Sequence, residues 1–124
     1  MMIDDDQDTL MLYELSIKET CYSSSFLTFD NAKKAIDYLE NCMEQRSMAP
    51  DYIIIDLNMP DMDGFQFLSA FEEKFYPSMS DTKIITATSS IREKDREKAN
   101  LYRSVVAFVP KPLSKAQLLE LFCI

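Results

Sequence analysis

The run "YIIIDL" at residues 52–57 constrains the fold more than any other stretch of this sequence. Near-continuous β-branched residues are typical of a strand that is buried on both faces, as in a parallel sheet covered by helices. The run nevertheless ends in a carboxylate, Asp56, and leads into the turn-like stretch "NMPDMDG". The sequence therefore predicts a central parallel strand with a polar carboxyl end.

The rest of the chain alternates short apolar runs with segments of helical periodicity. The runs predicted to form strands are 1–3, 24–29, 52–57, 82–89 and 104–110. The segments predicted to form helices are 9–19, 31–43, 67–75, 90–100 and 114–122. Five strands, each followed by a helix, predict one α/β domain over residues 1–124. Its fold is expected to be a flavodoxin-like, doubly wound parallel sheet of order 2-1-3-4-5 with helices on both faces.

Several residues set the expected helix faces and ends. Leu12 and Leu15 recur at helical spacing in the first helix, and Asp30 or Asn31 is expected to cap the second helix, whose apolar stripe ends at Met43. Capping boxes are expected to open the last two helices. Their residue pairs are Ser90 with Glu93 and Ser114 with Gln117.

Composition excludes several classes of function. The net charge of −8 argues against a nucleic-acid partner, and no apolar run is long enough to span a membrane. The absence of histidine removes the usual general base, and a single glycine, Gly64, excludes glycine-rich nucleotide loops. Three cysteines without metal-type spacing and the lack of a signal peptide favour reduced thiols in the cytoplasm.

Polar residues follow four of the predicted strands. Ligands of open parallel sheets bind outside the carboxyl ends of the strands, where the strand order reverses. The predicted topology brings Asp4, Asp5, Asp56, Thr88 and Lys111 to that edge. Gathered carboxylates repel one another and suit Mg²⁺, while Lys111 and Thr88 can bind phosphoryl oxygens. These are the parts that phosphoryl transfer needs, with Asp56 as the candidate nucleophile.

With these residues in place, the chain resembles the receiver domain of a two-component response regulator. The resemblance rests on "IDDD" at 3–6, "IIIDLNMPDMDG" at 53–64, "TATSS" at 86–90 and "FVPKPL" at 108–113. These motifs cover nearly the whole chain in the family's order. The resemblance implies a bacterial-type signalling switch with the CheY-like form of the predicted fold. It also implies that Asp56 accepts a phosphoryl group from a histidine kinase or a histidine phosphotransfer protein.

The resemblance also implies a role for each site residue. Asp5 and Asp56 would bind Mg²⁺ directly, the backbone carbonyl of Asn58 would be a further ligand, and Asp4 would act through water. In the family, a threonine, a switch aromatic and a lysine before a cis proline bind and report the phosphoryl group. The corresponding residues here are Thr88, Phe108 and Lys111.

Three features depart from the family pattern. The first strand has only three residues before the acids, and Phe108 stands where tyrosine is frequent. The run "TATSS" offers two threonines, so Thr86 is the alternative to Thr88 as the switch residue.

The expected output is a protein contact, because no DNA-binding or enzymatic output domain is expected within these residues. The expected contact surface is formed by segments 90–100, 104–110 and 114–122. It would be read by a downstream protein that the sequence does not name, or it would join two copies of the chain. Chemistry would be limited to phosphorylation and dephosphorylation of Asp56 itself.

Two other functions are alternatives. One is a receiver-like interaction module that works without phosphate. The other is a small Mg²⁺-dependent aspartyl phosphatase of the haloacid-dehalogenase kind. That family needs Asp-x-Asp-x-Thr after its first strand, whereas Thr9 directly follows Asp8 here.

Overall fold

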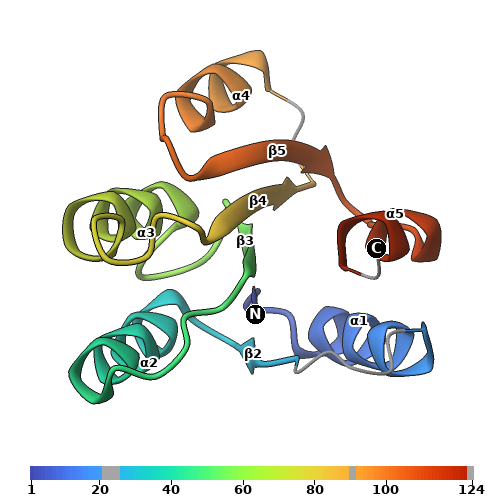
Figure 1. Cartoon of the computed structure of the whole chain (residues 1–124). Coiled ribbons are helices and arrows are strands. Elements are labelled where there is room, and N and C mark those ends of the chain that lie inside the picture. The colour runs from blue at the N-terminus through green and yellow to red at the C-terminus, as the bar shows by residue number, and fades with distance from the viewer. Residues whose placement is uncertain (21–25, 90–91, 123–124) are drawn as a thin grey trace.

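The computed structural model describes residues 1–20, 26–89 and 92–122, and it confirms the predicted fold. One parallel sheet has five strands in the order β2-β1-β3-β4-β5, with helices on both faces (Figure 1). The strands are β1 (Met2–Ile3), β2 (Thr28–Phe29), β3 (Tyr52–Asp56), β4 (Lys83–Thr88) and β5 (Val105–Pro110). The helices are α1 (Gln7–Thr20), α2 (Ala32–Gln45), α3 (Gly64–Ala70), the π-helical η1 (Phe71–Phe75), α4 (Glu93–Ala99) and α5 (Lys115–Phe122).

Strand β1 is only two residues long, yet it is paired on both sides. Met2 and Ile3 lie opposite Thr28 and Phe29 of β2, and on the other side opposite Ile54 and Ile55 of β3. Because β1 and β3 run parallel in this register, the residues that follow β1 emerge beside the end of β3. The short first strand is therefore sufficient to bring the first acids to Asp56.

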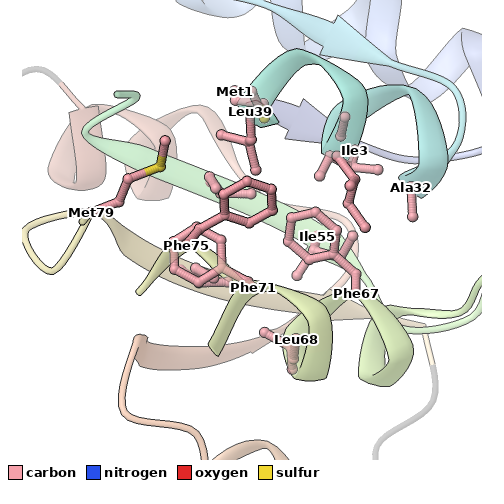
Figure 2. Close-up of a cluster of buried hydrophobic side chains, with 14 of the residues drawn as sticks. Met1, Ile3, Ala32, Leu39, Ile55, Phe67, Leu68, Phe71, Phe75 and Met79 are labelled. Carbon is pink, nitrogen blue, oxygen red and sulfur yellow. The ribbon is translucent and has the colours of Figure 1, made fainter. Parts of the chain in front are cut away.

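The isoleucines of β3 serve two hydrophobic clusters, one on each face of the sheet. Helices α2 and α3 cover one face of the sheet, and α1 and α5 cover the other (Figure 1). Ile53 and Ile55 belong to the cluster on the first face, whereas Ile54 belongs to the cluster on the second. Figure 2 shows residues of the first cluster, among them Ile3, Leu39, Ile55, Phe67, Phe71 and Phe75. The alternation confirms that β3 is buried on both faces and explains why its sequence lacks a polar face.

The buried face of α1 differs from the prediction. Leu12 and Leu15 are 63% and 53% exposed, whereas Leu10, Tyr13 and Ile17 are buried. Helix α1 carries apolar residues on most of its sides, so the spacing of these residues alone does not identify the face that packs on the sheet.

Helix α2 also departs from the predicted stripe at its end. Met43 is 39% exposed, and the neighbouring Cys42 is buried with a free thiol. The helix continues to Gln45 and ends where Arg46 adopts a left-handed conformation with φ of 53°. Cys21 and Cys123, which were expected to be reduced, lie outside the described residues.

Several other boundaries are shifted, and the predicted cap of α5 is confirmed. Strand β2 begins at Thr28 rather than at 24, although 24 and 25 lie outside the described residues. Helix α4 begins at Glu93 without a side-chain cap, and the predicted cap residue Ser90 lies outside the described residues. At α5, Ser114 Oγ accepts a hydrogen bond from the Gln117 N–H at 3.1 Å, and Gln117 Oε1 accepts one from the Ser114 N–H at 2.8 Å.

The cap of α2 leads to a prediction about stability. Asn31 Oδ1 accepts a hydrogen bond from the Lys34 N–H at 2.8 Å. Because Asn31→Ala leaves this N–H without its side-chain partner, we expect the free energy of unfolding to fall by about 1 kcal/mol. Urea denaturation measures this change, and Lys33→Ala on the exposed side of the same turn is the control. Equal stability of Asn31→Ala and wild type would contradict the capping role.

Candidate functional site

Asp56 occupies the last position of β3, at the carboxyl edge of the sheet. Its side chain is only 8% exposed, and its Oδ1 accepts a hydrogen bond from the Asn58 N–H at 3.1 Å. The chain then turns back over the strand, and the Gly64 N–H donates to the Leu57 carbonyl at 3.1 Å. Packing on both faces of β3 therefore fixes the backbone that carries this carboxylate.

Two more carboxylates follow β1. Asp4 is fully buried and its Oδ1 accepts a hydrogen bond from the Asp6 N–H at 2.9 Å, whereas Asp5 is exposed. Ligand oxygens of Asp4, Asp5 and Asp56 all lie within 4.8 Å of one another. The structure thus brings together the three acids that the sequence singled out.

Lys111 follows the end of β5 and reaches two of these acids. Its Nζ lies 2.5 Å from Asp4 Oδ2 and 3.2 Å from Asp56 Oδ2. The approach to Asp4 is an ion pair outside hydrogen-bond geometry, so the buried Asp4 Oδ2 accepts no hydrogen bond from the described residues. The Lys111–Pro112 peptide bond is cis, as the resemblance implies.

The two candidate threonines occupy different places. Thr88, the last residue of β4, is fully buried, and its Oγ1 accepts a hydrogen bond from Asn58 Nδ2 at 3.0 Å. Thr86 Oγ1 instead donates to the Ala107 carbonyl at 3.3 Å, within the sheet. Of the two hydroxyls, Thr88 is therefore the one that contacts a residue of the site edge.

Phe108 lies on β5, next to Thr86 of β4. Its ring is half-buried, and the Arg96 guanidinium of α4 lies 5.3 Å from the ring centroid. This cation–π contact links the expected switch aromatic to a helix with only one buried residue, Ala99. Helix α4 lies beside β5 at the edge of the molecule (Figure 1).

The sequence of the whole domain agrees with this arrangement. Residues 1–122 match the family model described as the response regulator receiver domain. The chain belongs to this family. The similarity extends to solved structures: a two-component response regulator from Cytophaga hutchinsonii has a TM-score of 0.87 and 27% sequence identity, over 98% of this chain and 91% of that one.

Curated relatives of this receiver domain are of very different lengths. An uncharacterized 14.6 kDa protein of Leptolyngbya boryana is 28% identical over 98% of this chain and 84% of its own length. The transcriptional regulatory protein CitT of Halalkalibacterium halodurans is 27% identical over 93% of this chain and 46% of its own length. The receiver thus spans less than half of the second relative. No helix among the described residues is long and apolar enough to cross a membrane.

Burial and charge act in opposite directions on the receiver's ionisable groups. Burial raises the pKa of Asp56 above its usual value and the charge of Asp4 adds to this, while the Asn58 N–H and Lys111 oppose it. Burial alone lowers the pKa of the Lys111 ammonium, but Asp4 and Asp56 outweigh burial, so its pKa lies above the ordinary value. At neutral pH, Lys111 is therefore a cation held between two acids.

The raised pKa of Asp56 predicts how stability depends on pH. The folded state binds a proton more readily than the unfolded state, so the Asp56 contribution to stability falls as pH rises from the unfolded pKa through the folded pKa. We therefore expect Asp56→Asn to be more stable than wild type at neutral pH, with a difference that shrinks in acid. Thermal unfolding across this pH range tests it, and a less stable variant at neutral pH would contradict the argument.

The donor set fits a hard divalent cation. Mg²⁺ prefers carboxylate oxygens and keeps several waters, and here three carboxylates converge while Asp5 remains open to solvent. The roles of Asp5 and Asp56 as direct ligands, of Asp4 through water and of the Asn58 carbonyl stay predictions.

Two contacts were missed by reasoning from the sequence. The Asn58 side chain binds Thr88, and Tyr13 Oη accepts a hydrogen bond from the Leu113 N–H at 2.8 Å, just after the Lys111 turn. Both pairs join residues far apart in the chain. The position of Asn58 two residues after Asp56 was the available signal for the first contact, and no sequence feature indicated the second.

Proposed function

We propose that this receiver domain is a phosphoacceptor switch whose acceptor is Asp56. The observation that carries the proposal is the convergence of an acid cluster, a paired lysine and a buried threonine at the end of β3. A carboxylate next to an ammonium can attack a phosphorus atom while charge on the phosphoryl oxygens is neutralised.

The donor is the phosphohistidine of a histidine kinase or a histidine phosphotransfer protein. A carboxylate oxygen of Asp56 forms a bond to phosphorus, the P–N bond breaks, and its electron pair leaves with the imidazole nitrogen. The product is an acyl phosphate on Asp56. No histidine or nucleotide loop is needed in the receiver, since the phosphoryl group arrives already activated.

The residues around Asp56 have separate roles in binding the phosphoryl group and neutralising its charge. Lys111 exchanges its contacts with Asp4 and Asp56 for the phosphoryl oxygens, and the Thr88 hydroxyl donates to one of them. Mg²⁺, held by Asp5, Asp56 and the Asn58 carbonyl, with Asp4 acting through water, would supply further charge neutralisation. Chemistry at Asp56 is limited to its own phosphorylation and dephosphorylation.

The output is a change in surface rather than a product. Rotation of the Thr88 side chain toward the phosphoryl group alters the space available to Phe108, and Phe108 contacts Arg96 of α4. The proposed readout is the surface of α4, β5 and α5, which a downstream protein or a second copy would bind in one of two states. The light packing of α4 supports its role as the moving element.

Intact-mass analysis after treatment with acetyl phosphate and Mg²⁺ tests the acceptor role. We expect one phosphoryl adduct on wild type and none on Asp56→Asn, because the amide lacks a nucleophilic oxygen anion. Omitting Mg²⁺ should reduce the adduct. An unmodified, folded wild type would instead favour a receiver that binds its partner without phosphate.

A further inference from the structure

Asn58 contacts both the proposed acceptor and the proposed switch residue. Its backbone N–H donates to Asp56 Oδ1 at 3.1 Å, and its side-chain Nδ2 donates to Thr88 Oγ1 at 3.0 Å. One exposed residue thus bridges the ends of β3 and β4. The two contacts use different groups of Asn58, so the side chain can be changed while the backbone contact is kept.

The contact fixes the polarity of the threonine hydroxyl. An amide nitrogen carries only donor hydrogens, so Thr88 Oγ1 must be the acceptor, and the hydroxyl hydrogen must point in another direction. The oxygens of a phosphoryl group only accept hydrogen bonds. If the hydroxyl accepts a hydrogen bond from Asn58 and donates one to a phosphoryl oxygen, each donor hydrogen faces an acceptor. Hydrogen bonds in such a chain reinforce one another.

The backbone of Thr88 leaves its side chain few other degrees of freedom. Thr88 is paired with Pro110 of β5, and its carbonyl accepts a hydrogen bond from the Lys111 N–H at 2.8 Å. The residue is fully buried, and a β-branched side chain has few rotamers. With the backbone held, Asn58 acts on the orientation of the side chain and its hydroxyl, because it contacts that hydroxyl directly.

We propose that Asn58 is a positioning residue whose side-chain amide orients the Thr88 hydroxyl to donate to the phosphoryl group on Asp56, and so couples phosphorylation to the switch. This inference rests on the proposed function. Asn58 acts through Thr88 and, by its side chain, takes no part in the transfer of the phosphoryl group. Its effect should therefore appear in the switched population and vanish when the Thr88 hydroxyl is absent.

The test uses the full chain with Mg²⁺ and beryllofluoride, which mimics a phosphoryl group on an aspartate. Five proteins are compared: wild type, Asn58→Leu, Asn58→Asp, Thr88→Val and the double variant Asn58→Leu/Thr88→Val. Fluorine NMR measures beryllofluoride occupancy, and the amide shifts of Phe108 and Ala99 measure the switched fraction at full occupancy. We expect Asn58→Leu to lower the ratio of switched to unswitched protein about fivefold, the size of one neutral hydrogen bond.

The double variant distinguishes positioning from a general structural effect. In the Thr88→Val background, Asn58→Leu should cause no further loss, because the group it orients is gone. Asn58→Asp keeps the shape of the side chain, but its carboxylate only accepts hydrogen bonds, so the Thr88 hydroxyl should donate to it instead of to the phosphoryl group. Its ratio of switched to unswitched protein should therefore match that of Thr88→Val. Each variant is measured at its own saturating Mg²⁺ concentration, which removes the effect of the added charge.

Two results would overturn the inference while leaving the proposed function intact. One is a full switch in Asn58→Leu at full occupancy, and the other is equal losses from Asn58→Leu with and without the Thr88 hydroxyl. A wild type that binds no beryllofluoride and takes no label from acetyl phosphate would instead overturn the proposed function, and the inference with it.

Discussion

Lys111→Met is expected to slow phosphoryl transfer to Asp56 about a hundredfold, the scale seen when one group that stabilises developing negative charge is removed. The same change should lower the free energy of unfolding at neutral pH by about 3 kcal/mol, because it leaves buried carboxylates without their cation. Lys111 contacts Asp4 at 2.5 Å and Asp56 at 3.2 Å, and the three side chains are 16%, 1% and 8% exposed.

The loss of stability in Lys111→Met should depend on pH. Without the ammonium, the pKa of Asp56 should rise further, so protonation of Asp56 replaces the lost positive charge as pH falls. The stability deficit should therefore shrink in acid, as followed by denaturant unfolding at several pH values. Lys115→Met is the matched control, because Lys115 pairs with Glu19 on the surface, with side chains 55% and 65% exposed. Equal transfer rates or equal stability in Lys111→Met and the control would contradict the account.

Gly64→Ala should have an effect of similar size on stability, by a different mechanism. Gly64 opens α3, and a Cβ there would lie 2.6 Å from Leu57 Cα and 2.8 Å from the Asp56 carbonyl oxygen. Backbone atoms of a buried strand end cannot move aside easily. We therefore expect a loss of about 3 kcal/mol in the free energy of unfolding, at the upper end for overpacked sites.

The same substitution tests how Asp56 is held in place. Because the clash falls on the backbone that carries Asp56, Gly64→Ala should also reduce labelling by acetyl phosphate in the fraction that remains folded. Glu73→Ala, an exposed change in the following η1 turn, is the control and should leave stability within about 0.5 kcal/mol of wild type. A Gly64→Ala protein as stable as this control would show that the strand end relaxes freely.

Prediction from the sequence succeeded where one physical signal dominated. The isoleucines of β3 allow only a strand covered on both faces, and parallel strand ends must meet at one edge. Those two constraints fix the sheet and bring Asp4, Asp5, Asp56 and Lys111 together. The cap at Ser114 was also predictable, because its hydrogen bonds are local.

Prediction failed where packing between elements distant in the sequence determines which side chains are buried and which contacts form. On α1, Leu12 and Leu15 have the same spacing as a core stripe, and only the contacts with the sheet and α5 select Leu10, Tyr13 and Ile17 as the buried face. Leu12 and Leu15 are as apolar as the buried residues, so hydropathy does not reveal that they are exposed. The Asn58–Thr88 contact is hidden for the same reason, since it joins the loop after β3 to the end of β4, thirty residues away in the sequence.

The most direct test of the central claim identifies the residue that carries the phosphoryl group. After reaction with acetyl phosphate and Mg²⁺, borohydride reduces an acyl phosphate on aspartate to homoserine, which peptide mass spectrometry can place in the sequence. We expect homoserine at position 56 in wild type and nowhere in Asp56→Asn. Modification of Asp4 or Asp5 with Asp56 unchanged, or equal labelling of Asp56→Asn, would contradict it.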